Sequence, residues 1–111
     1  MSLCHDLADR IVNSRIDNSD HKIIEASKSA ILDTIGVTLI GSKSEATRSV
    51  IKALEAKNSS DGVLIYGKKL RLSPLDAAMI NGTSSHALDF DDCNNTMGGH
   101  PTVPIFGGLL A

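Results

Sequence analysis

The stretch that decides the fold, residues 21–41, reads H-K-I-I-E-A-S-K-S-A-I-L-D-T-I-G-V-T-L-I-G. Apolar residues recur along it at helical spacing, and its main apolar face consists of Ile24, Ile31, Ile35 and Leu39. Toward residue 40 the apolar side chains spread almost all round the helix. Such a pattern is typical of a helix that is covered on more than one side. The sequence therefore predicts a long buried helix over about residues 21–40.

The ends of this helix and one interior glycine need separate reasons. Asp20 or Ser19 precedes it and is the expected N-cap, because a short polar side chain can accept from the first free backbone N–H groups. Gly41 is a natural residue just beyond its end. Gly36, in the interior, costs about 1 kcal/mol relative to Ala. We expect the close approach of another helix to explain Gly36.

Three further helices are predicted near residues 3–15, 43–57 and 74–88. Ser2 is available to cap the first of them. Ser42 and Glu45 form a capping box for the second, with Ser42 as the cap and Glu45 as the third helical residue. Ser73 and Pro74 open the last one with a cap hydroxyl and a proline at the first helical position. These start signals predict a chain built mainly of helices.

The remaining segments fix the fold class and the domain organisation. Residues 63–72 predict one short strand or a small two-stranded ribbon, so the expected class is all-α. A chain of 111 residues is enough for one small domain. Its last segment, Val103–Ala111, is apolar and carries no capping residue and no polar tail. We therefore expect residues 1–111 to be a partial helical domain, truncated inside a helix.

Composition excludes several classes of function. The net charge is −2 and the basic residues are scattered, which argues against a nucleic-acid partner. No apolar run approaches the roughly 20 residues that span a bilayer, and residues 1–9 lack the features of a signal peptide. Cys4 and Cys93 lie far apart in sequence, and we expect two free thiols in a reducing cytoplasm, with Cys4 in the core. The sequence thus predicts a cytoplasmic protein with neither a membrane nor a nucleic-acid partner.

Polar, chemically active residues are concentrated between residues 81 and 104. This window holds His86, Asp89, Asp91, Asp92, Cys93 and His100. If the last helix continues past His86, then His86 and Asp89 lie three residues apart on one face, where imidazole and carboxylate can meet. The residues alone leave two interpretations equally open. One is a solvated acidic loop with a capping histidine, and the other is a site for a small anionic or hydroxylated ligand.

Known metal and nucleophile motifs fit this window poorly. A calcium loop counted from Asp89 places Asn94 where glycine is needed and His100 where glutamate is needed. A structural zinc site needs paired cysteines or histidines at short spacing, and Cys93 has no second cysteine near it. A Cys93–His100 nucleophile pair stays open but has no orienting residue around it. The sequence therefore predicts no metal site.

Three segments of the chain form a recognisable set of motifs: I-L-D-T-I-G-V at 31–37 with Gly41, N-G-T at 81–83 followed by H-A-L-D-F-D-D at 86–92, and H-P at 100–101 with Pro104. In these segments the chain resembles the MmgE/PrpD family, whose 2-methylcitrate dehydratases are metal-free lyases. Their order and rough spacing also agree with the family pattern. The resemblance extends from the first helix to the last residue. It implies that this chain is the N-terminal part of a large helical domain.

The resemblance also implies an activity and a set of site residues. Family members act on small polycarboxylates by dehydration, decarboxylation or epimerisation, use no metal or other cofactor, and usually form homodimers. Carried over by motif, the expected catalytic residues are Asp89, Cys93 and His100. His86 and Asp92, from the same motif, are the expected substrate-binding residues. The family usually has Thr at the position of Cys93, and a thiol is the poorer hydrogen-bond donor.

The implied chemistry is proton abstraction from a carbon next to a carboxylate. His100 is expected to serve as acid, base or carboxylate clamp, and Asp89 to orient a histidine or a substrate hydroxyl. Asp91 and Asp92 are expected to cap and solvate the loop. The alternative from another class is a catalytically inert, truncated helical module. Both interpretations predict that residues 1–111 alone have no activity, since only one wall of a site is present.

Overall fold

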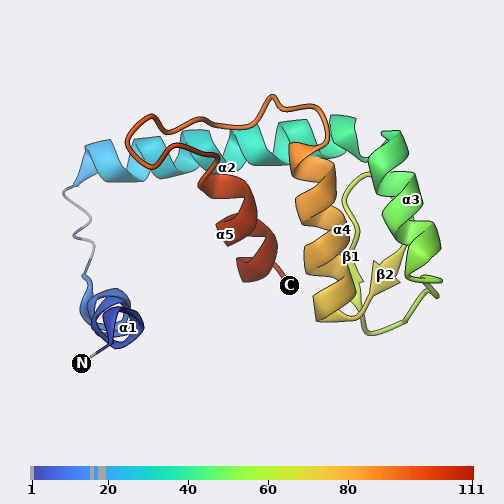
Figure 1. Cartoon of the computed structure of the whole chain (residues 1–111), viewed down its shortest axis with the longest axis horizontal. Helices are drawn as coiled ribbons and strands as arrows, with labels where there is room; N and C mark the ends of the chain where they lie inside the picture. Colours follow the sequence, from blue (N-terminus) through green and yellow to red (C-terminus); the bar gives the residue numbers. More distant parts are fainter. Residues whose placement is uncertain (1, 16, 18–19) are drawn as a thin grey trace.

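The computed structural model describes residues 2–15, 17 and 20–111 and is drawn in Figure 1. In these residues it has five helices and one two-stranded antiparallel sheet: α1 (Leu3–Asn13), α2 (His21–Gly41), α3 (Glu45–Ala53), β1 (Val63–Leu64), β2 (Arg71–Leu72), α4 (Pro74–His86) and α5 (Thr102–Leu109). The predicted all-α class with a small ribbon is therefore confirmed. Across the described ranges, none of the helices has both the length and the apolar character of a membrane span.

The starts of α1 and α4 follow the predicted caps, and that of α3 does not. Ser2 accepts from the backbone N–H of His5, and Ser73 accepts from that of Asp76 at 3.2 Å. The cap of α3 is Ser44, so the predicted cap at Ser42 is wrong. The last turn of α2 extends through Ser42, whose hydroxyl donates to a carbonyl of that turn. The next free cap position is therefore two residues later.

The start of α2 uses the backbone rather than a side-chain cap. Asp20 occupies the N-cap position, but its side chain makes no capping hydrogen bond. The other predicted cap, Ser19, lies outside the described residues. The backbone N–H of Ile24 donates to the Asp20 carbonyl at 3.2 Å, which closes the first turn. This helix start is therefore weaker than those of α3 and α4, each of which has a capping hydroxyl.

The α4 helix lies at the centre of the molecule and packs against α2, α3, α5 and both strands (Figure 1). The buried apolar cluster consists of Ile65, Leu72, Ala77 and Ile80. Side chains from α3 and its C-terminal end, Val50, Ile51 and Leu54, cover it from one side. Burying a side chain of this size contributes roughly 1.5–3 kcal/mol. The core is therefore small and lies between α3, the ribbon and α4.

The contact between α2 and α4 is lined by small hydroxyl side chains rather than by isoleucines. The buried residues of α2 are Thr34, Val37, Thr38 and Gly41. The predicted inward face is wrong at Ile31 and Leu39, which are 42% and 45% exposed. The hydroxyls of Thr38 and Ser85 lie 2.6 Å apart across the contact. Such small side chains let the two helices approach closely where larger ones would hold them apart.

Gly41, rather than Gly36, is the glycine that a neighbouring helix requires. A Cβ built on Gly41 would lie 1.9 Å from the carbonyl oxygen of Ser84, a distance that real atoms do not tolerate. A Cβ on Gly36 would meet nothing within 4 Å. The close approach expected at Gly36 therefore occurs five residues later, at the end of α2.

Besides the apolar packing of Leu72, one polar side chain of α4 joins the ribbon to that helix. Val63 pairs with Leu72 and Leu64 with Arg71 in the antiparallel ribbon. The side-chain amide of Asn81 accepts from the backbone N–H of Tyr66 and donates to the Leu64 carbonyl, both at 3.0 Å. Asn81 thereby fixes the ribbon against the middle of α4.

The α1 helix forms as predicted but contributes nothing to the core. None of its residues is buried, and Figure 1 shows it apart from the other helices. Its apolar residues Leu3, Leu7 and Ile11 are 83%, 56% and 66% exposed. Cys4 is also exposed, so its predicted place in the core is wrong, while both cysteines are free as expected.

Candidate functional site

The site begins where α4 ends, two residues earlier than predicted. His86 is the last residue of α4, and Ala87 is its C-cap. Asp89 then adopts a positive φ of 54°, a left-handed conformation that Asp tolerates better than most residues. This turn moves the Asp89 carboxylate off the helix face. The predicted pairing of His86 with Asp89 is therefore replaced by a pairing of His86 with Asp91.

Asp91 is buried between two histidines. Its side chain is 0% exposed, and its two oxygens lie 3.0 and 3.1 Å from Nδ1 of His86. The second oxygen also lies 3.2 Å from Nδ1 of His100. A buried carboxylate needs such partners, because an unpaired charge away from water is strongly unfavourable. The expectation that Asp91 solvates the loop is therefore wrong.

His100 joins the other two predicted catalytic residues. Its Nε2 lies 3.5 Å from Oδ1 of Asp89 and 3.7 Å from Sγ of Cys93. Asp89 is exposed, with 77% of its side chain open to solvent, whereas the His100 side chain is only 25% exposed. The structure thus brings Asp89, Cys93 and His100 together around one imidazole nitrogen.

The loop that carries His100 is ordered by its own hydrogen bonds. The side chain of Asn94 accepts from the backbone N–H groups of Thr96 and Met97, both at 2.9 Å. Asn94 also pairs with Gly99 through the backbone, and Gly98 supplies the positive φ of 67° that the turn needs. The loop therefore returns on itself and directs His100 back toward the end of α4, as the sequence predicts.

Asp92 lies at the start of α5 rather than in the cluster. Its carboxylate accepts from the backbone N–H of Thr102 at 3.2 Å and from the hydroxyl of the same residue. Thr102 is the first residue of α5, so Asp92 satisfies a donor that the helix itself leaves free. This contact joins Asp92 to α5 rather than to the loop that it was expected to cap, and the cluster of His86, Asp89, Asp91 and His100 does not include it.

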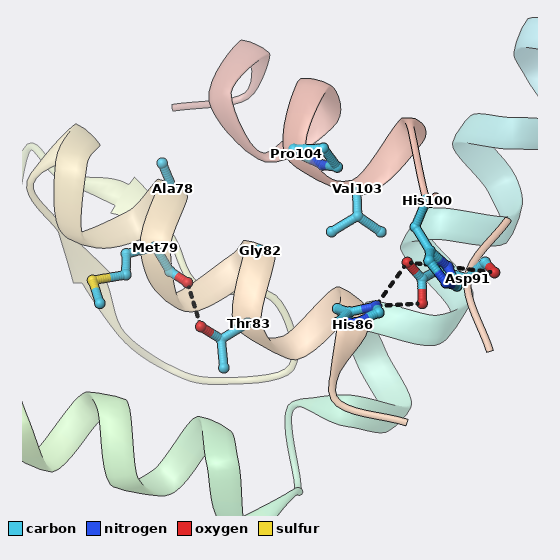
Figure 2. A pocket seen from close by; sticks show the side chains of 9 residues that line it. All are labelled: Ala78, Met79, Gly82, Thr83, His86, Asp91, His100, Val103 and Pro104. Atoms are coloured by element: carbon cyan, nitrogen blue, oxygen red, sulfur yellow. Dashed lines mark hydrogen bonds and ion pairs between the residues drawn. The ribbon is translucent and has the colours of Figure 1, made fainter. Parts of the chain in front are cut away.

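A cavity of about 400 Å³ lies between α4 and α5, with the two histidines at one end (Figure 2). It is lined by Ala78, Met79, Gly82, Thr83, His86, Asp91, His100, Val103 and Pro104. Figure 2 shows the rings of His86 and His100 directed toward Asp91, and the two ring centroids are 4.9 Å apart. A volume of this size suits a small molecule. Its apolar walls and polar end would orient a ligand that has both kinds of surface.

Four ionisable side chains of the site lie close enough together to hold a metal ion. One ligand atom from each of His86, Asp89, Asp91 and His100 lies within 4.8 Å of the others. Imidazole and carboxylate are ligands that many divalent cations accept. However, both oxygens of Asp91 already lie within hydrogen-bond distance of Nδ1 of His86, at 3.0 and 3.1 Å, and one of them lies 3.2 Å from Nδ1 of His100. Contacts between the side chains themselves therefore hold Asp91 in the cluster.

Comparison with known proteins assigns the chain to a family. The model of the MmgE/PrpD N-terminal domain matches residues 5–111. The chain belongs to the MmgE/PrpD family. Two curated relatives of this MmgE/PrpD chain are the cis-aconitate decarboxylases of Mus musculus and Homo sapiens, which are 32% and 29% identical to it over 110 residues. Each alignment covers 98% of this chain and 22% of the relative, and no solved structure matches.

The comparison confirms the resemblance inferred from the motifs, and it leaves the roles of single residues as predictions. In this MmgE/PrpD chain, sequence reasoning missed the buried position of Asp91 and the cavity wall formed by Val103 and Pro104. The repeated acids of D-F-D-D were visible, but nothing in the sequence fixes which of them turns inward. That depends on α4 ending at His86, and no glycine or proline marks this end.

Proposed function

We propose that this chain forms one wall of the active site of a lyase that acts on small polycarboxylates. The observation that carries the proposal is the convergence of Asp89 and Cys93 on Nε2 of His100, beside the cavity that His100 lines. An imidazole nitrogen that is partly shielded and directed toward acidic partners suits proton transfer. Both relatives are cis-aconitate decarboxylases, which supports a polycarboxylate as the substrate.

The proposed reaction passes through a carbanion-like state next to a carboxylate. In decarboxylation, a carbon–carbon bond breaks, carbon dioxide leaves, and the electron pair that stays on carbon takes up a proton. In dehydration, a base removes a proton from carbon and hydroxide leaves from the neighbouring carbon. His100 is the proposed acid or base in either reaction, and Asp89 orients it or a substrate hydroxyl. The thiol of Cys93 lies near Nε2 of His100, as the carboxylate of Asp89 does.

Decarboxylation is the first reaction to test, because both relatives carry that activity in their names. Dehydration of 2-methylcitrate, the activity that the sequence motifs suggest, is the second candidate. Cys93, in a position where the family usually has Thr, is the residue of this wall expected to bear on the choice of substrate. We further propose that the catalytic protein is a cytoplasmic homodimer that needs neither a metal nor another cofactor.

The chain spans 22% of the length of the curated relatives that it matches, so activity is proposed for the whole protein. Catalysis depends on several groups held in one preorganised site. Residues 1–111 alone are therefore expected to be inactive. The competing hypothesis is a catalytically inert helical module. The two hypotheses are distinguished by whether a longer product, made from a continued reading frame, has activity.

The test measures carbon dioxide release from cis-aconitate and dehydration of 2-methylcitrate. It uses residues 1–111 and, where the reading frame continues, the longer product. We expect turnover only in the longer product, with His100→Ala lowering kcat by about 100-fold or more. His21→Ala, an exposed histidine at the start of α2, is the control and should leave kcat unchanged. Turnover that survives His100→Ala, or a longer product inactive on both substrates, would contradict the proposal.

A further inference from the structure

We propose that Asp91 is a positioning residue that fixes the same tautomer, with the proton on Nδ1, in both His86 and His100. Each neutral imidazole then keeps its lone pair on Nε2. The inference concerns the arrangement of the two rings, and its catalytic meaning rests on the function proposed above. It assigns a role to a carboxylate that motif comparison did not single out.

Burial is the first reason to separate Asp91 from the other acids of the loop. It is the only ionisable residue in the buried class among the residues that the structure describes. Asp89 is exposed and Asp92 caps α5. A carboxylate withdrawn from water is tolerated only where donors satisfy its oxygens. At Asp91 the imidazole of His86 is the hydrogen-bond partner of the carboxylate, and Nδ1 of His100 lies 3.2 Å from it.

Hydrogen-bond direction then fixes the tautomers. An ionised carboxylate only accepts, so a neutral imidazole within hydrogen-bond distance of it must donate. Nδ1 of His86 lies 3.0 Å from one oxygen of Asp91, and Nδ1 of His100 lies 3.2 Å from the other. Nδ1 of His100 also lies 3.3 Å from the backbone carbonyl oxygen of Asp91, which is a second acceptor. Both Nδ1 atoms must therefore carry hydrogen.

The consequence is that one buried residue sets the chemistry of two rings. With hydrogen on Nδ1, Nε2 of a neutral His100 can accept a proton, and the Cys93 thiol 3.7 Å away is a donor suited to it. A protonated His100 would instead donate from Nε2 toward Asp89, 3.5 Å away. Asp91 thus keeps Nε2 of His100 available for proton transfer in either state, and it does the same for His86 at the cavity.

The experiment reads the tautomers directly by long-range ¹H–¹⁵N correlation spectra of the chain labelled at histidine, in alkaline buffer where imidazole is neutral. We expect His86 and His100 in the Nδ1–H form. The exposed His5 and His21 are internal references and should show the Nε2–H form that predominates in free histidine. His5 also has Nε2 directed at Asp9, 3.8 Å away. A dominant Nε2–H form at either His86 or His100 would overturn the proposal.

Asp91→Asn sharpens the test, because an amide has one accepting oxygen and replaces the other acceptor by a donor. The Nδ1–H form is expected to lose population at His86, whose Nδ1 contacts both side-chain oxygens, while His100 keeps the backbone carbonyl of Asp91 as an acceptor. Asp92→Asn, which weakens only the cap of α5, is the matched control and should leave both tautomers unchanged. A folded Asp91→Asn protein with both tautomers unchanged would contradict the assignment.

The two proposals fail separately. The spectra of the unsubstituted chain decide the role of Asp91 even if Asp91→Asn does not fold. They do not require turnover, so the expected tautomers together with a longer product inactive on both substrates would refute the proposed function alone. Active protein with the other tautomer would refute the role of Asp91 alone.

Discussion

The α1 and α4 helices differ in a way that separates helix formation from burial. Every fourth residue from Leu3 to Ile11 is apolar, so α1 has the stronger periodic pattern, yet none of its residues is buried. In α4 the buried residues are Ala77, Ile80, Asn81, Ser84 and Ser85, a set that no apolar pattern would select. Periodicity therefore predicts where a helix forms. The shape and chemistry of its neighbours decide which side is buried.

Small side chains let α2 pack closely against α4. Ser85 of α4 contacts Thr38, and a Cβ built on Gly41 would overlap the Ser84 carbonyl. The α1 helix has no such surface, since its apolar side chains are large and exposed. The comparison teaches that in this chain close contact depends on small residues at crossing points, and less on the apolar area that a helix offers.

The sharpest test of the comparison removes one isoleucine from each region. Ile80→Ala should lower the free energy of unfolding by about 4 kcal/mol, because Ile80 is fully buried and a cavity would remain. Ile11→Ala, at a residue 66% exposed, should change it by no more than about 0.5 kcal/mol. Urea unfolding followed by circular dichroism measures both. Equal losses for the two variants would show that α1 packs against the core after all.

The second test compares the two glycines of α2. Gly41→Ala should destabilise by about 3 kcal/mol, because the new methyl group would overlap the Ser84 carbonyl and push α2 and α4 apart. Gly36→Ala should stabilise by about 1 kcal/mol, since the site is open and alanine is the better helix former. The midpoints of thermal unfolding should move in opposite directions. Movement in the same direction would place a helix contact at Gly36.

The smallest expected effect on stability comes from α1 itself. Leu7→Ser should change the free energy of unfolding by less than about 0.5 kcal/mol, because Leu7 is 56% exposed. It should nevertheless reduce self-association, since exposed contiguous apolar surface drives contacts between molecules. Light scattering at several concentrations measures the effect, with Asp6→Ser on the same helix as the control. A chain that is monomeric before substitution would contradict this prediction.

The elements of the fold could be predicted because their signals are local. The hydroxyl of Ser73 and the ring of Pro74 act within one turn, so the start of α4 can be read from four residues. The cap of α3 could not be assigned in the same way, because the capping box with Glu45 indicates Ser42, whereas the cap in the structure is Ser44. The choice between them depends on how far α2 continues. The predicted buried face of α2 was wrong for a similar reason. Burial of Thr38 depends on Ser85, which lies 47 residues away in sequence.

The sequence predicts which residues make up the site, but not which acid contacts which histidine. The window from 81 to 104 contains every ionisable residue of the cluster, and the return of the loop to His100 follows from its glycines and asparagines. The partner of His86 depends on one backbone angle, the positive φ of Asp89. That angle decides whether the first or the second acid of D-F-D-D faces the imidazole. Local rules permit both, so only the folded chain distinguishes them.

The amide of Asn81 has a consequence for how the ribbon is held together. Two strands of two residues each are too short to persist on their own. Asn81 donates to the carbonyl of Leu64 in β1 and accepts from the backbone N–H of Tyr66, two residues beyond β1, as the edge of a third strand would. Through this one side chain, α4 supplies part of the pairing that so short a ribbon lacks by itself.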